Sequence, residues 1–223
     1  MKIDSASILE EYTANQQKYN ALAERVSFLL YKSIEGNRLK IHSLTHRIKE
    51  IGSIIDKMRR KNIANPFLEM HDIVGFRVVC LFLADLEPVR DIIRTDFDVF
   101  DEDNKIDDQE LDTFGYMSLH IKAKLKPSAE EAQNCQIMEI PFEIQVRTIA
   151  QDAWASISHH IDYKTKSTMS RRLKRDFNAL SGLFYVADTH FALIKQHILE
   201  QPIEMKGKYD RPNSQPAISM DDE

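Results

Sequence analysis

The run IVGFRVVCLFL, residues 73–83, constrains the fold more than any other stretch of this sequence. It is rich in β-branched residues and almost continuously apolar, which is typical of a central strand that is covered on both faces. Such a strand needs neighbouring strands to satisfy its backbone and further elements to cover its side chains. The run therefore predicts a sheet at the core of the fold.

The hydrophobic period predicts the remaining elements. Patterns with strand character predict strands at 97–100, 116–125 and 137–147, where Pro141 is tolerated only at an edge or a bulge. Helical spacing predicts helices at 5–31, 40–61, 85–95, 148–163 and 168–199. We expect an α/β (α+β) fold in which a mixed sheet of about five strands is flanked by helices. The helices extend the domain at its N- and C-terminal ends, and the domain spans 1–200, followed by a polar, disordered tail over 201–223.

Composition limits the class of protein. The chain has 223 residues, of which 43% are hydrophobic and 29% charged, as expected for one compact domain. Cys80 and Cys135 lie in apolar runs without metal-ligand partners at zinc-site spacing, so we expect buried thiols and a cytoplasmic location. No apolar run approaches the ~18 residues of a membrane span, and we expect no membrane partner.

Charge is distributed unevenly along the chain. The segment 38–61 is basic and could hold a polyphosphate, although a solvated helix face would have the same composition. Within its predicted helix, Ser53 and Lys57 are four residues apart and share a face, while Arg47 and Lys49 lie near the helix entrance. The segment 96–112 is acidic and irregular, which predicts an exposed loop. The formal net charge of −5 disfavours nonspecific binding of nucleic acid by the whole chain.

Two strands carry side chains that could perform chemistry. Glu143, Gln145 and Arg147 alternate with apolar residues, so all three line one strand face, as they also would on an edge strand with one wet face. Asp72 directly precedes the apolar strand, where it is either a turn residue or a ligand at the strand end. Two carboxylates on neighbouring strands commonly hold Mg²⁺ against nucleotide phosphates.

The segment FGYMSLH, residues 114–120, adds a possible base-binding turn. Gly115 permits a tight turn, and Tyr116 supplies an aromatic face for a base, with His120 on the same side of the following strand. A purely structural turn would have the same residues. The sequence contains no GxxxxGK[ST], GxGxxG or kinase signature, so side chains rather than a glycine-rich loop would hold any nucleotide.

Four motifs in order resemble one family, the synthetase domain of the RelA/SpoT proteins, and in particular its small single-domain alarmone synthetases. They are RIKEIGSIIDK, DIVGFRVV, GYMSLH and FEIQVRTIAQDAWASISHHIDYK, and the resemblance covers roughly residues 38–190. It implies a nucleotidyltransferase-like synthetase fold and an enzyme, a GTP pyrophosphokinase. Such an enzyme transfers the β,γ-pyrophosphate of ATP to the 3′-hydroxyl of GDP or GTP, with Mg²⁺, and makes ppGpp or pppGpp and AMP.

The resemblance also implies roles for single residues. On the ATP side, two arginines would flank the adenine and three further side chains would hold the phosphates: Arg47 and Arg77, then Lys49, Ser53 and Lys57. Asp72 would ligate Mg²⁺, and Glu143 would help to place the metal and accept the proton of the ribose hydroxyl. On the acceptor side, one residue would stack on guanine and three would orient the nucleotide: Tyr116, then His120, Gln145 and Arg147.

Some features leave the acceptor and the assembly open. The family turn often has basic residues before its glycine and a basic or amide residue at position 117, whereas this chain has LDTF at 111–114 and Met117, so the preference between GDP and GTP stays open. Toxin-type relatives that pyrophosphorylate the 3′ end of tRNA are an alternative, with RRLKR (171–175) and KMRRK (57–61) as RNA contacts. A non-enzymatic nucleotide-binding module is another. An apolar stripe along 173–194 predicts a homo-oligomer, with a tetramer as one option.

Overall fold

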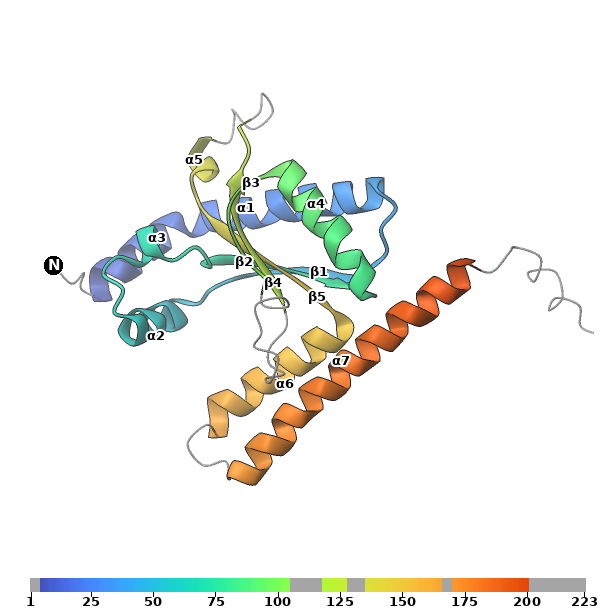
Figure 1. Ribbon diagram of the computed structural model, residues 1–223. Coiled ribbons are helices and arrows are strands. Elements are labelled where there is room, and N and C mark those ends of the chain that lie inside the picture. Colours follow the sequence, from blue (N-terminus) through green and yellow to red (C-terminus); the bar gives the residue numbers. More distant parts are fainter. Residues whose placement is uncertain (1–4, 105–117, 128–134, 166–169, 201–223) are drawn as a thin grey trace, which may run out of the picture.

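The computed structural model describes residues 5–104, 118–127, 135–165 and 170–200 (Figure 1). Its centre is a five-stranded sheet with the strand order β1-β2-β5-β4-β3. The β2–β5 pair is parallel, and the other three pairs are antiparallel. The strands are β1 (Ile41–Ile48), β2 (Val74–Cys80), β3 (Phe97–Asn104), β4 (Leu119–Leu125) and β5 (Phe142–Thr148). The predicted mixed sheet flanked by helices is thus confirmed.

Strand β2, which contains the apolar run, lies between β1 and β5. Val74, Phe76 and Val78 are fully or almost fully buried, while Gly75 and Arg77 between them are half-buried. The prediction that both faces are covered was therefore wrong for the first part of the strand. One face is packed and the other is open, because the residues at alternate positions belong to a cavity rather than to a second core layer.

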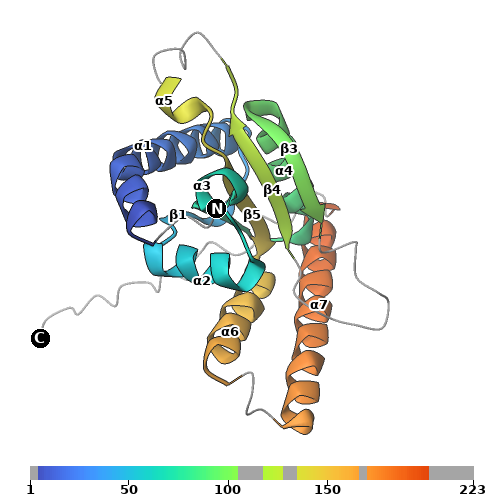
Figure 2. The same cartoon turned by 90° about the vertical axis from the view of Figure 1, so that its left-hand side faces the viewer.

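Two helices cover the packed face of the sheet. They are α1 (Ser5–Gly36), which runs beyond the predicted end at residue 31, and α4 (Leu86–Asp96). Both helices contact strands and each other, and their buried side chains join those of the strands in one cluster. Figure 2 shows α1 and α4 beside the sheet. With the core confined to this face, the polar side chains of the strands are left on the other.

The helix predicted over 40–61 is wrong in its first half, because 41–48 form strand β1 and only α2 (Ile51–Lys61) is helical. Ile41, Leu44 and Ile48 have helix-like spacing, yet all three pack on the core from a strand. A register shift between Ile41 and Ser43 brings Ile41 onto the same side as the others. Pairing with β2 therefore overrides the local period.

Other boundaries also differ from the predictions. Residues 135–138 form a short helix, α5 (Cys135–Met138), so the last strand begins at 142, directly after Pro141. The strand predicted at 97–100 is confirmed, but it extends to 104 as the edge strand β3, into the segment predicted as an acidic loop. Exposed Asp98 and Asp101 interrupt an otherwise pairing-prone edge. Short helices α3 (Pro66–Glu69) and η1 (Leu83–Asp85) complete the described connections. The predicted tail, 201–223, lies outside the described residues.

Helices α6 (Ile149–Thr165) and α7 (Arg171–Glu200) form a pair that projects beyond one end of the strands in Figures 1 and 2. The Trp154 and Phe177 rings stack between them, with centroids 5.1 Å apart. Farther along α7, Lys195 Nζ donates to Asp85 of η1 at 2.5 Å. No helix in the described part of the chain is both long and apolar enough to cross a membrane.

Candidate active site

A cavity of about 270 Å³ opens on the uncovered face of the sheet. Its lining comes from β1, β2, β5 and the turn before β2, and consists of Thr45, His46, Arg47, Asp72, Gly75, Phe76, Arg77, Glu143 and Gln145. The parallel register places Gly75 opposite Glu143 and Arg77 opposite Gln145. Five of the residues predicted for a nucleotide site therefore meet in one cavity: Arg47, Asp72, Arg77, Glu143 and Gln145.

Two lysines converge on one oxygen of Asp72. Lys57 Nζ donates to Asp72 Oδ2 at 2.6 Å, and Lys49 Nζ donates to the same oxygen. Burial raises the pKa of Asp72, but the two lysine bonds outweigh it and hold that pKa below its usual value. Burial lowers the pKa of Lys49, and its bond to Asp72 offsets this only in part. Oδ1 of Asp72 is buried and has no hydrogen-bond partner among the described residues.

The residues of the predicted ATP side come from strands β1 and β2, from helix α2 and from the connection between β1 and α2. Arg47 lies on β1 and Lys49 in the connection to α2. The prediction that both residues belong to the helix was therefore wrong. Ser53 and Lys57 lie on α2, four residues apart and on one face, as predicted. The backbone N–H of Lys49 donates to Ile73 O at 2.8 Å, which ties this connection to the residue after Asp72.

A chain of hydrogen bonds crosses the open face from β4 to the end of β5. Nδ1 of His120 lies 2.7 Å from Oε1 of Glu143, and Gln145 Nε2 donates to Glu143 Oε2 at 3.2 Å. Arg147 Nη2 donates to Gln145 Oε1 at 2.7 Å, which fixes the orientation of the amide. Burial raises the pKa of Glu143, but the bond and charge of His120 outweigh it and keep that pKa below its usual value.

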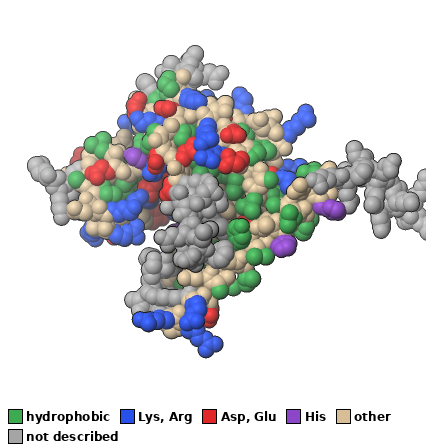
Figure 3. Space-filling model, in the orientation of Figure 1, with side chains coloured by type: hydrophobic (Ala, Val, Ile, Leu, Met, Phe, Trp, Pro, Cys, Tyr) green, Lys and Arg blue, Asp and Glu red, His purple; other side chains and the backbone are tan. Residues whose placement is uncertain are grey.

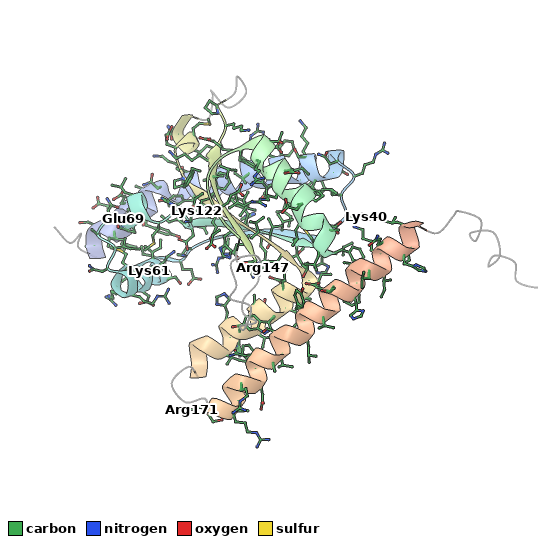
Figure 4. The ribbon with its side chains drawn as sticks, viewed as in Figure 1. Lys40, Lys61, Glu69, Lys122, Arg147 and Arg171 are labelled. Atoms are coloured by element: carbon green, nitrogen blue, oxygen red, sulfur yellow. The ribbon has the colours of Figure 1, made fainter. Side chains whose placement is uncertain are left out.

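The guanidinium of Arg147 is the most deeply buried cation of this face. Its side chain is 1% exposed, and Figure 4 shows it in the middle of the molecule, near the start of α6. Burial, reinforced by the nearby charge of Arg77, lowers the pKa of Arg147 to about 10. Asp152 of α6 opposes that shift, since its Oδ1 lies 3.2 Å from Arg147 Nη1.

Sequence reasoning did not single out Asp152. It lies in the first turns of α6, and its Oδ1 is also 3.1 Å from Arg77 Nη1. The available signal was position: an acid four residues after Thr148 follows the strand that carries Arg147. Acids near a helix N-terminus are common for dipole reasons alone, so this signal is weak.

The remaining predictions concern the proposed guanine-stacking residue and the two cysteines. Tyr116 lies outside the described residues, so its stacking on guanine stays a prediction, as does the contribution of Met117. Cys80 is a buried free thiol, as predicted, and burial raises its pKa to about 12. Cys135 begins α5, but its side chain is not among those described.

Comparison with known proteins identifies the family. A family model described as "Region found in RelA / SpoT proteins" matches residues 46–168. The GTP pyrophosphokinases YjbM and YwaC of Bacillus subtilis (strain 168) are 33% and 28% identical, over 74% and 75% of this chain and 77% and 80% of theirs. The crystal structure of the small alarmone synthetase 1 from Bacillus subtilis is 25% identical, covers 86% of this chain and 100% of its own, and has a TM-score of 0.73. These matches show that the chain belongs to the RelA/SpoT family.

Proposed function

We propose that this protein is a GTP pyrophosphokinase, which transfers pyrophosphate from ATP to the 3′-hydroxyl of GDP or GTP. The observation that carries the proposal is that Asp72 and Glu143 line one cavity, with two lysines gathered on the first carboxylate. The two curated relatives named GTP pyrophosphokinase support the same activity. The products would be ppGpp or pppGpp, and AMP.

The donor nucleotide would bind at the β1 and β2 side of the cavity. Lys49, Ser53 and Lys57 would contact the phosphates, and Arg47 and Arg77 would flank the adenine. In the structure both lysines form ion pairs with Asp72. A triphosphate that enters would compete for their ammonium groups, because phosphate oxygens are strong acceptors of charge-assisted hydrogen bonds. Binding would therefore release Asp72 for another cation.

We further propose Mg²⁺ as the cation that Asp72 takes up, with Glu143 as the second carboxylate. Oδ1 of Asp72 is buried without a hydrogen-bond partner among the described residues, which leaves lone pairs for a ligand. No group of three His, Cys, Asp or Glu side chains in the described ranges would hold a metal alone. This donor set fits Mg²⁺, which typically takes one or two carboxylates together with phosphate oxygens and water. When bound, Mg²⁺ would neutralise charge on the phosphates.

Glu143 would act as the general base. A sugar hydroxyl is a poor nucleophile, and a carboxylate in hydrogen-bonding reach is a suitable acceptor for its proton. The 3′-oxygen would attack the β-phosphorus of ATP while its proton passes to Glu143. The bond from the β-phosphorus to the bridging oxygen of the α-phosphate would break, and AMP would leave. His120 and Gln145 contact the two oxygens of Glu143 and would orient the base.

An acceptor competition tests the proposal. The protein would be incubated with γ-³²P ATP and Mg²⁺ in the presence of GDP, GTP, ATP and bulk tRNA together, and the labelled products separated. We expect the label in a guanine nucleotide. Label in tRNA alone would overturn the proposal in favour of the toxin-type alternative, in which Arg171, Arg172 and Arg175 at the exposed start of α7 would contact RNA. Retention of all label in ATP would indicate a binding module.

We also infer a homo-oligomer that forms through α7. Large apolar side chains along this helix are exposed, including Leu183 at 65% and Ile198 at 66%. Figure 3 shows hydrophobic side chains along the helix. An exposed apolar surface of this kind marks an interaction site, and a second copy of the chain offers the same surface. Light scattering after size exclusion should give a mass above one chain of 25.9 kDa. The variant Leu183→Glu should dissociate it, whereas a monomeric wild type would contradict the inference.

A cytoplasmic location is proposed on chemical grounds. Cys80 is a free thiol, as expected in a reducing compartment, and the nucleotide substrates are made there. Fractionation of cells that express the tagged protein would test this, and recovery in the membrane fraction would contradict it.

A further inference from the structure

We propose that Asp152 is a positioning residue that ties Arg77 to Arg147 and thereby couples the donor side of the cavity to the acceptor side. The inference rests on the proposed function, which assigns Arg77 to the ATP side and Arg147 to the side of the acceptor nucleotide. It predicts that one carboxylate outside the sheet controls the binding of both nucleotides. Asp152 is not a catalytic residue in this view, because it acts through the two arginines.

The geometry places Asp152 between two strands. Its Oδ1 lies 3.1 Å from Nη1 of Arg77 on β2 and 3.2 Å from Nη1 of Arg147 on β5. A single carboxylate oxygen thus serves two guanidinium groups from neighbouring strands. In the parallel register Arg77 is paired with Gln145, and Arg147 with Val79, so the two arginines are two positions apart along the strands.

The two arginines can lie this close together because the carboxylate of Asp152 offsets their positive charges. Arg77 and Arg147 repel each other, and Arg147 is 1% exposed, so water screens the repulsion poorly. The negative charge of Asp152 opposes the effect of Arg77 on Arg147. Without it, we expect Arg77, which is 32% exposed, to swing toward solvent, because it is the more exposed of the two arginines. Arg77 would then leave the cavity that it lines.

The start of α6 is anchored well enough to hold Asp152 in place. The backbone N–H of Thr148 donates to Gln151 Oε1 at 2.9 Å, and the N–H of Gln151 donates to Thr148 Oγ1 at 3.1 Å. This reciprocal pair is a capping box, which fixes the first helical turn. Thr148 Oγ1 also donates to Asp188 of α7 at 2.5 Å. The helix that carries Asp152 is therefore bound to both β5 and α7.

The experiment measures ligand binding, because binding is independent of turnover. The wild type, Asp152→Asn and Asp152→Glu would be titrated with a non-hydrolysable ATP analogue in a calorimeter, and KM and kcat would be measured for both substrates. We expect Asp152→Asn to weaken the analogue and to raise the acceptor KM, each roughly tenfold, as for the loss of one charged hydrogen-bond partner. Asp152→Glu, which keeps the negative charge, should bind the analogue more tightly than Asp152→Asn but less tightly than the wild type. Asp91→Asn, on the exposed surface of α4, is the matched control and should change neither value.

A double-mutant cycle separates positioning from a simple role in capping α6. In the Arg77→Gln background the repulsion between Arg77 and Arg147 is gone and only the weaker effect of Arg47 on Arg147 remains. Asp152→Asn should then cost less than about threefold in analogue affinity. Under a capping role the two changes would multiply, and that result would overturn the proposal. Unchanged binding by Asp152→Asn in an active enzyme would overturn it as well.

The same measurements distinguish this proposal from the proposed function. If the wild type fails to label any guanine nucleotide while Asp152→Asn still weakens the analogue in an Arg77-dependent way, positioning stands and the proposed activity falls. If the wild type labels GDP or GTP normally and Asp152→Asn behaves like Asp91→Asn, the activity stands and the positioning role falls.

Discussion

His120 of β4 and Glu143 of β5 are diagonal neighbours on adjacent strands, with Nδ1 of the histidine 2.7 Å from Oε1 of the carboxylate. Each side chain is 14% exposed, so the pair is partly shielded from water. Because a carboxylate only accepts hydrogen bonds, Nδ1 must carry the proton in this arrangement. The histidine thus favours the ionised form of the residue that we propose as the base.

Replacement of Glu143 by glutamine should leave the fold intact and stop transfer. The amide has nearly the same shape but can neither accept the proton nor supply negative charge to a metal. We expect kcat to fall by roughly 100-fold to 10,000-fold, the usual contribution of general acid–base catalysis. Rate measurement with γ-³²P ATP and GDP checks this, and circular dichroism checks the fold. Turnover near that of the wild type would remove Glu143 from the mechanism.

Replacement of His120 by asparagine should shift the pH dependence of the reaction. Burial raises the pKa of Glu143 and His120 lowers it, so the variant should have a higher Glu143 pKa. A base must be ionised to act, and the acidic limb of kcat/KM should therefore move to higher pH. In the wild type that limb should lie below 4.5, the ordinary value for a glutamate. His42→Asn, at an exposed position of β1, is the control; a limb that does not move in His120→Asn would contradict the assignment.

Replacement of Asp72 by asparagine should raise the Mg²⁺ concentration that half-maximal activity requires. A neutral amide oxygen is a poorer ligand for a hard cation than a carboxylate. We expect a rise of at least ~10-fold, the loss that even an outer partner of a metal ligand causes. A Mg²⁺ titration of the initial rate at saturating ATP measures it. If the Mg²⁺ dependence is unchanged, Asp72 serves only as the partner of Lys49 and Lys57.

The sequence predicted the sheet and most helices because their signals are local. Strand β2 has a continuous apolar run, and helices α6 and α7 have long stretches of helical hydrophobic spacing. All three lie close to the predicted positions. Strand β1 was mistaken for a helix because its apolar residues follow the helical spacing, and only the bulge near Ile41 reconciles that spacing with a strand. A bulge depends on the partner strand, so no local pattern reveals it.

The site was predicted more fully than the contacts that organise it. Motif order identified Asp72 and Glu143, which the structure brings into one cavity. It did not reveal that Lys49 and Lys57 both bind Asp72, nor that Asp152 joins two arginines. Lys49 and Asp72 are 23 residues apart in the sequence, and such distant contacts depend on the tertiary fold.

The contact between α7 and the end of β5 predicts a pH effect on stability. Asp188 is 2% exposed, and burial raises its pKa above the ordinary 3.8, although the bond from Thr148 opposes the shift. A raised pKa means that the folded state binds the proton more tightly than the unfolded chain. Tighter proton binding by the folded state stabilises the protein at low pH. The free energy of unfolding should therefore fall as pH rises from about 3.8 through the raised pKa of Asp188, and should stay reduced above it.

The variant Asp188→Asn tests this directly, because its amide oxygen can still accept from Thr148 Oγ1 but carries no charge to bury. Urea denaturation at pH values from about 4 to about 8, in steps of about one unit, should show a wild type that loses stability relative to the variant as the pH rises. Asp188→Ala is the contrast: it leaves the Thr148 hydroxyl without this acceptor and should cost about 1–3 kcal/mol. A constant difference between the wild type and Asp188→Asn at every pH would show that folding does not raise the pKa of Asp188. Its bond to Thr148 would then be an ordinary contact that fastens α7 to the strand of Glu143 and Arg147.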